Sequence, residues 1–186
     1  ECIVFVDDDV YRLISLVGYS YMNITSAANA ARIVENTANI AREIGTAVFG
    51  FNQAFDVRKF QPMKPFLVSS WAGGVIGVIG RDFRYDTGLR LRADIDFCLQ
   101  VIQERRFVFI ENRIAFVHKR FGLTGGNAVN RSGERNKQEL TYLQRKWGPH
   151  LEVTNSKGTT LLRIHARRQQ KTIQLAGDDT DGAGPQ

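Results

Sequence analysis

Residues 2–9 read CIVFVDDD, and this stretch decides the fold that the sequence predicts. Cys2–Val6 is a continuous run of apolar and β-favouring residues, which is typical of a strand buried on both faces. The run ends abruptly in Asp7, Asp8 and Asp9. We therefore predict a buried strand with a cluster of carboxylates at its C-terminal end.

The first and last carboxylates of this triplet, Asp7 and Asp9, predict a metal site. The alternation of a strand puts both side chains on one side, where they repel each other unless a divalent cation neutralises them. Carboxylate oxygens are hard ligands that suit Mg²⁺ or Mn²⁺. An exposed acidic turn without a metal is the alternative interpretation of the same residues.

The rest of the chain mixes helical and extended patterns. Loops are expected over residues 53–65, which contain two prolines and little periodicity, and over residues 122–133, which are rich in Gly, Asn, Ser and Thr. We expect helices over residues 26–43, 94–105 and 133–147, and strands over 46–51, 66–70, 72–80, 107–110, 114–117, 151–153 and 160–164. The prediction is one α/β domain over residues 1–175, with a mixed sheet flanked by helices, and a disordered tail over residues 176–186.

The predicted strand over residues 72–80 alternates glycine with valine and isoleucine. Glycines at this density permit the backbone to approach another chain segment or a ligand closely. A tightly packed strand with a bulge explains each single glycine equally well.

Two later groups of residues also have chemical potential. Asp94 opens the predicted helix over residues 94–105, where it is expected to cap the N-terminus and where an ionised carboxylate can act as a base. His118 follows a predicted strand and precedes Lys119 and Arg120. An imidazole can complete a metal site begun by carboxylates, and the two cations suit a diphosphate. The alternatives are a plain helix cap and a surface or core histidine.

Charge is unevenly distributed along the chain. Residues 1–80 carry 6 basic and 7 acidic side chains, whereas residues 81–171 carry 19 and 9. The positive second half suits either a polyanionic partner or a solvated basic surface. Cys2 and Cys98 are expected as free thiols, and no apolar run is long enough for a membrane span, so we expect a soluble cytoplasmic protein with no membrane partner.

The order of these features resembles the GT-A glycosyltransferases, whose sheet is Rossmann-like. The resemblance covers residues 3–126 and rests on a D-x-D triplet, a glycine-rich strand, an acidic helix start and a histidine before a loop. It implies a donor-binding or metal-binding role for Asp7, metal ligation by Asp9 and His118, catalysis by Asp94 as the base, and contact with the leaving diphosphate for Lys119 and Arg120.

The implied activity is transfer of a sugar from a nucleotide-sugar donor, most simply a UDP-sugar, to a hydroxyl group with inversion and with Mn²⁺ or Mg²⁺. Two features depart from the family. Ala93 stands where the family has a glutamate before the base. The strands and helices with which GT-A enzymes bind the nucleobase precede the D-x-D and are not in this sequence. We therefore expect a missing N-terminal segment or a second chain to complete the donor pocket.

Within the superfamily the chain looks most like the TET-associated glycosyltransferases, many of them phage-encoded, which are proposed to modify hydroxymethylated pyrimidines in DNA. A DNA acceptor predicts a groove lined by arginines and an aromatic ring, Trp71 or Tyr85, that stacks on an extruded base. The arginines expected in this groove are Arg81, Arg84, Arg90 and Arg92.

Other functions share part of this pattern. One is a GT-A transferase that acts on a protein, a lipid carrier or a polysaccharide. Another is a non-catalytic nucleic-acid-binding module in which the acidic triplet is a surface turn. A nucleotidyltransferase shares the metal chemistry but gives Asp94 and His118 no role.

Overall fold

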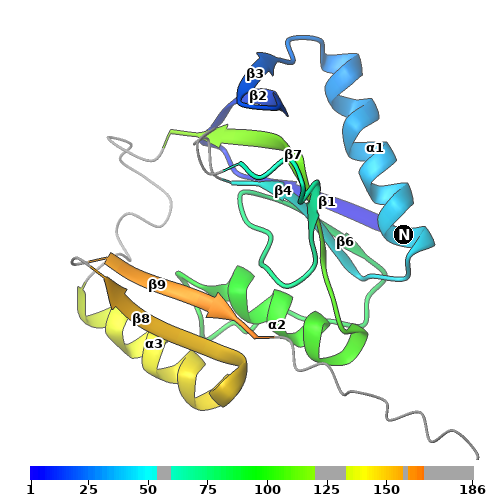
Figure 1. The fold of residues 1–186 in the computed structure, drawn as a ribbon. Helices are drawn as coiled ribbons and strands as arrows, with labels where there is room; N and C mark the ends of the chain where they lie inside the picture. The colour runs from blue at the N-terminus through cyan, green and yellow to red at the C-terminus, as the bar shows by residue number, and fades with distance from the viewer. Residues whose placement is uncertain (54–59, 120–132, 157–158, 166–186) are drawn as a thin grey trace, which may run out of the picture.

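The computed structural model describes residues 1–53, 60–119, 133–156 and 159–165 (Figure 1). These residues form a mixed seven-stranded sheet, a separate two-stranded sheet and three α-helices. The expected α/β class, with a mixed sheet flanked by helices, is confirmed. None of the described helices is long and apolar enough to cross a lipid bilayer.

The large sheet has the strand order β1-β6-β4-β7-β2-β3, with β5 paired to β7. Among the described strands only β4 and β7 pair in parallel, and the other neighbours are antiparallel. The carboxyl ends of β1, β4 and β7 therefore lie in one row. This row of strand ends is called the edge of the sheet below, and it differs from an edge strand, which is the outermost strand. The strands are β1 (Cys2–Val6), β2 (Val10–Val17), β3 (Ser20–Asn23), β4 (Val48–Asn52), β5 (Phe66–Leu67), β6 (Val75–Ile79) and β7 (Phe109–His118).

Helix α1 (Ala27–Glu43) covers one face of this sheet. The Ser26 side chain caps the helix by accepting a hydrogen bond from Asn29 N, and Gly45, with φ +78°, follows its last turn. Ala38 and Ala41 of the helix pack against Phe49 and other inward-facing residues of the sheet. The predicted helix and its stop are confirmed.

Helix α2 (Ala93–Arg105) lies on the other face, and helix α3 (Gly133–Trp147) lies farther from the sheet, beside the C-terminal hairpin (Figure 1). Phe97 and Leu99 of α2 are fully buried beneath the sheet, and Leu143 of α3 joins the same core. The short helix η3 (Gly148–His150) ends α3 and leads into a hairpin of β8 (Leu151–Ser156) and β9 (Thr159–Ile164). The predicted third helix and closing hairpin are both confirmed.

The prediction that β1 is buried on both faces is wrong. Cys2 and Val4 pack towards α1, but Ile3 and Phe5 on the opposite face are 48% and 49% exposed. The reason is position, since β1 is the edge strand of the described sheet and α2 does not reach over it. The strand buried on both faces is the central β4, where Val48 faces α2 and Phe49 faces α1.

Two other elements differ from the prediction. Residues 107–110 and 114–117 were expected as separate strands, but Phe109–His118 is one strand, β7, whose register with β4 shifts between Phe51 and Asn52. The polar residues Asn112 and Arg113, in the middle of the strand, lie at this irregularity. The hairpin of β2 and β3 was not predicted, although Gly18, with φ +58°, marks its turn.

Some predictions fall outside the described residues. These are Arg120, residues 54–59 of the loop expected over residues 53–65, most of the loop expected over residues 122–133 and the tail over residues 176–186. Cys2 and Cys98 are both free thiols, as expected.

Candidate functional site

The connection from β1 to β2 places the acidic triplet over the edge of the sheet. Strand β1 pairs with β6 and strand β2 pairs with β7, so residues 7–9 connect the β6 side of the sheet to the β7 side. The crossing is fixed at both sides: Asp7 N donates to Gly74 O at 2.7 Å, and Lys119 N donates to Asp9 O at 3.0 Å. Three residues are enough for this connection because the start of β6 and the end of β7 converge here, where Gly74 lies against His118.

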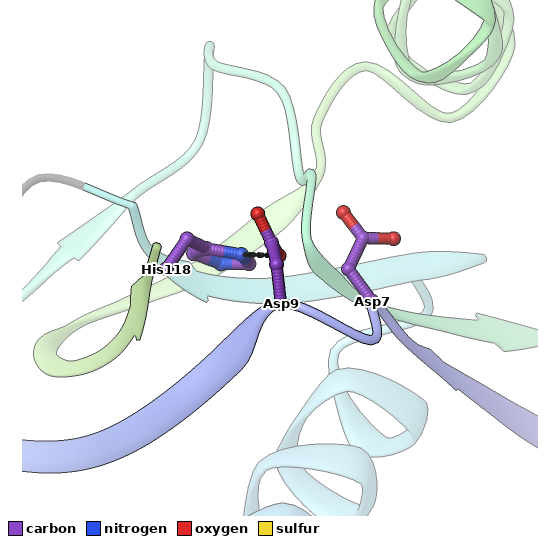
Figure 2. Close-up of side chains that lie close together, drawn as sticks. All are labelled: Asp7, Asp9 and His118. Carbon is purple, nitrogen blue, oxygen red and sulfur yellow. Dashed lines mark hydrogen bonds and ion pairs between the residues drawn. The ribbon is translucent and has the colours of Figure 1, made fainter. Parts of the chain in front are cut away.

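This crossing brings Asp7 and Asp9 to His118, the last residue of β7. One ligand atom from each of the three side chains lies within 4.8 Å of the others. His118 Nδ1 is 2.8 Å from Asp9 Oδ1, and Figure 2 shows Asp7 beside this pair with its carboxylate on the same side. The predicted convergence of the three residues is therefore present in the fold.

The reason given for that convergence was wrong in one respect. Asp7 and Asp9 were expected to share a side because a strand alternates, but β1 ends at Val6 and Asp8 and Asp9 form a turn. The turn reverses the chain direction, because Val10 N donates to Asp7 O at 3.3 Å. The exposed Asp8 is not part of the cluster.

Glycine is required beside the imidazole. A Cβ on Gly74 would lie 2.3 Å from His118 Nε2, and the residue has φ +70°, which side chains rarely adopt. The close approach predicted for the glycine-rich segment is confirmed here, and the backbone of Gly74 forms one wall of the cluster.

The electrostatics of the cluster favour a cation. Partial loss of water raises the pKa of the Asp7 carboxyl above its ordinary value, His118 opposes this rise, and Asp9 and Asp8 add to it by repulsion. A bound divalent cation would relieve the repulsion between the carboxylates.

One pair of donor atoms already has the spacing of two neighbouring ligands on a small ion. Ligands at about 2.1 Å from a metal and at right angles to each other are roughly 3 Å apart. Asp9 Oδ1 and His118 Nδ1, at 2.8 Å, already have this separation. Two hard oxygens and one imidazole nitrogen fit Mn²⁺ or Mg²⁺ and leave the remaining positions to water or substrate. The residues present therefore fit such an ion.

Asp94 lies at the same edge but is not a member of this cluster. It was expected to cap α2, but Arg92 is the N-cap and Asp94 is the second helical residue. Its Oδ1 accepts a hydrogen bond from the adjacent Ile95 N at 2.9 Å. Burial raises its pKa to about 6, and the charge of Asp7 contributes to the rise. A carboxylate with this pKa is ionised at neutral pH and is still basic enough to accept a proton.

Gln53 and Gly73 lie against Asp94 and were not predicted as site residues. A Cβ on Gly73 would be 2.8 Å from Asp94 Oδ2 and 3.2 Å from the Gln53 side-chain amide. Gln53 Nε2 donates to Trp71 O at 3.2 Å. The sequence does contain a signal for Gln53, because the residue directly follows the buried strand β4 and so lies at the same strand edge as Asp7.

Of the two aromatic candidates, Tyr85 lies close to the acidic groups. Its ring stacks on Phe97 at 4.3 Å between centroids, and the residue is 38% exposed. Burial raises the pKa of its hydroxyl, and the charges of Cys98, Asp94 and Asp7 add to this effect. Trp71 instead packs against the core beneath α2.

The basic residues are less concentrated than the sequence suggested. Arg81 forms an ion pair with Glu1, and Arg84 donates to two nearby backbone carbonyls. Arg92 lies beside Asp94, and its Nε is buried without a hydrogen-bond partner among the described residues. Lys119 Nζ lies 5.7 Å from the ring centroid of Tyr11. The structure therefore groups Arg92 with the acidic site, but it gives Arg81 and Arg84 other partners.

Comparison with known proteins adds no family or function to this geometry. No protein-family model matches the chain, and searches of curated proteins and of solved structures gave no significant match.

Proposed function

We propose that this chain is a metal-dependent glycosyltransferase of the GT-A type, which moves a sugar from a nucleotide-sugar donor to a hydroxyl group. One observation carries the proposal. Asp7, Asp9 and His118, which come from distant parts of the sequence, meet at one edge of the sheet, while a separate, partly buried carboxylate, Asp94, lies against Gly73 at the same edge.

In this proposal Asp7, Asp9 and His118 would hold Mn²⁺ or Mg²⁺. The ion would supply Lewis-acid stabilisation of the departing diphosphate. The chain keeps its ligands in place without the ion, because the Asp9–His118 hydrogen bond and the two backbone anchors of residues 7–9 fix their positions. Lys119, whose backbone amide donates to Asp9 O, places a cationic side chain next to the cluster.

Asp94 is the proposed general base. Its partly buried position and its pKa of about 6 suit a group that takes the proton from an attacking hydroxyl at neutral pH. A base that is separate from the metal ligands can act on the side of the sugar opposite the diphosphate. The proposal therefore predicts inversion at the anomeric carbon.

For the acceptor we propose a hydroxymethylated pyrimidine in DNA. The excess of basic residues between positions 81 and 171 supports this choice, as does the partly exposed ring of Tyr85 near Asp94. A protein, lipid or polysaccharide acceptor would not require transfer to weaken steeply as salt is raised, so salt dependence separates these acceptors from DNA.

The test is a mass-spectrometric screen of nucleotide sugars against hydroxymethylated DNA in the presence of Mn²⁺. We expect a mass increase of one sugar on the modified base, loss of product in EDTA and loss of product with Asp94→Asn. A thermal-shift assay with UDP plus Mn²⁺ accompanies the screen. If no donor gives product and UDP plus Mn²⁺ does not stabilise the chain, the glycosyltransferase proposal is wrong. The results would then favour a non-catalytic nucleic-acid-binding module.

A further inference from the structure

A buried carboxylate on α3 holds the chain segment that leads to Asp94. Glu139 is 6% exposed, and its two oxygens accept hydrogen bonds from Arg90 N and Leu91 N, each at 3.0 Å. These contacts span almost fifty residues of sequence. A buried carboxylate is costly unless it is hydrogen-bonded, and both of its oxygens are used on this one segment.

The segment held by Glu139 sets the start of α2. Residues 90 and 91 precede the N-cap, Arg92, whose own side chain makes no capping hydrogen bond. Asp94 follows two residues later, on the first turn. The first turn of α2 thus lacks the usual side-chain cap, and Glu139 supplies the fixed point immediately before it.

A second contact from α3 reaches the same turn. Lys146 Nζ and Trp147 Nε1 each lie 2.8 Å from Asp96 Oδ1, and Asp96 is fully buried. Helix α3 therefore holds the chain on both sides of Asp94, at residues 90–91 and at residue 96.

Charge links Glu139 to Asp94 through Arg92. Burial lowers the pKa of Arg92, and the negative charges of Glu139 and Asp94 both oppose that shift, so the guanidinium lies within reach of the two carboxylates. Glu139 thus stabilises the cation beside Asp94 in addition to holding the backbone.

We propose that Glu139 is a positioning residue for Asp94: by binding the amides of residues 90 and 91 it keeps the start of α2, and with it the Asp94 carboxylate, in place at the sheet edge. Its effect on catalysis rests on the proposed function, whereas its effect on Asp94 itself does not.

The test compares Glu139→Gln with the matched control Glu134→Gln, an exposed position on the first turn of the same helix. Glutamine keeps the size of the side chain but has one acceptor oxygen, whereas the two backbone amides need two. Glu139→Ala is the second variant, and if it fails to fold the test rests on glutamine. The main measurement is the carboxyl ¹³C NMR titration of Asp94 in metal-free buffer, accompanied by Mn²⁺ affinity and by kcat and KM for transfer.

For Glu139→Gln we expect the Asp94 titration midpoint to fall towards the ordinary value of an aspartate. Release of residues 90–92 lets water reach the carboxyl, and burial is the largest cause of the raised pKa. The other groups coupled to Asp94 are Asp7, Arg92, Tyr85 and Cys98, and all remain in the variant. We also expect kcat to fall about tenfold with the KM for donor unchanged, and Mn²⁺ affinity to stay within about twofold of the wild type.

An Asp94 midpoint that stays the same in Glu139→Gln and in the control overturns the proposal. So does a fall in kcat that is matched by an equal loss of Mn²⁺ affinity, because a general loss of structure explains that result. If the wild-type chain transfers no sugar at all, the proposed function fails, and the titration alone decides the role of Glu139.

Discussion

A methyl group on Gly74 would lie 2.1 Å from Cε1 of His118, closer than any side chain can approach. We predict that Gly74→Ala displaces the imidazole and weakens Mn²⁺ binding by tenfold or more, about 1.4 kcal/mol. It also forces alanine into a left-handed backbone conformation, which costs about 1–2 kcal/mol of stability. Calorimetric titration with Mn²⁺ and thermal unfolding measure the two effects.

Gly80→Ala is the matched control for this prediction. Gly80 has φ +80°, but a Cβ there would meet nothing within 4 Å. It shares the backbone cost and lacks the contact with His118. Equal Mn²⁺ affinities in the two variants would show that the imidazole does not bind the ion.

The acidic triplet offers a comparison between neighbouring carboxylates. Asp9→Asn removes a proposed ligand and also the charged partner of His118, so we expect Mn²⁺ binding to fall below detection. Asp8→Asn changes the net charge equally at an exposed position outside the cluster. We expect it to bind Mn²⁺ within about threefold of the wild type, since only a long-range charge is lost. Similar losses in both variants would indicate a diffuse acidic surface.

The raised pKa of Asp94 predicts an unusual pH dependence of stability. Between about pH 4 and pH 6 the folded state binds more protons at this group than the unfolded state, so the free energy of unfolding falls as pH rises through this window. The whole change amounts to up to about 3 kcal/mol. Asp94→Asn removes it, and urea unfolding of both proteins at pH 4.5 and pH 7 in EDTA measures the difference. An equal change in the free energy of unfolding between pH 4.5 and pH 7 in the two proteins would contradict the raised pKa of Asp94.

The link between α2 and α3 depends on a buried carboxylate. Lys146 bonds both Asp96 and Asp86, and Asp96 is fully buried. Lys146→Met keeps the aliphatic part of the side chain but removes the cation from Asp96, so we expect a loss of about 2 kcal/mol in the free energy of unfolding. The control is Lys137→Met, at an exposed position on the same helix. Chemical denaturation that gives equal stabilities would show that Trp147 and Gln100 alone satisfy Asp96.

Helices and the hairpin at the C-terminal end could be predicted from local signals. Ser26 and Gly45 bracket α1, and Trp147 precedes a glycine and a proline at the end of α3. Burial was harder to predict, because an apolar run shows that a strand is suited to burial and does not show where the strand lies in the sheet. The runs at Cys2–Val6 and Val48–Asn52 look alike in sequence, yet one is at the edge and the other at the centre.

The residues of the candidate site could likewise be predicted only in part. Asp7, Asp9, Asp94 and His118 could be proposed because their side-chain chemistry is visible in the sequence and each lies next to a predicted element. Their roles remain predictions, although the first two and His118 do converge. Gln53 could have been chosen from its place directly after a buried strand, but Glu139 could not, because its contacts with residues 90 and 91 exist only in the folded chain.

The three-residue crossing between β1 and β2 also constrains how the protein reaches its folded state. Strands β1 and β2 are first in the sequence, but they pair with β6 and β7, which follow some seventy to a hundred residues later. Such non-local pairings slow folding, because a long loop must close before either contact is gained. A ribosome therefore has to deliver the chain as far as His118 before Asp7 and Asp9 can meet the imidazole.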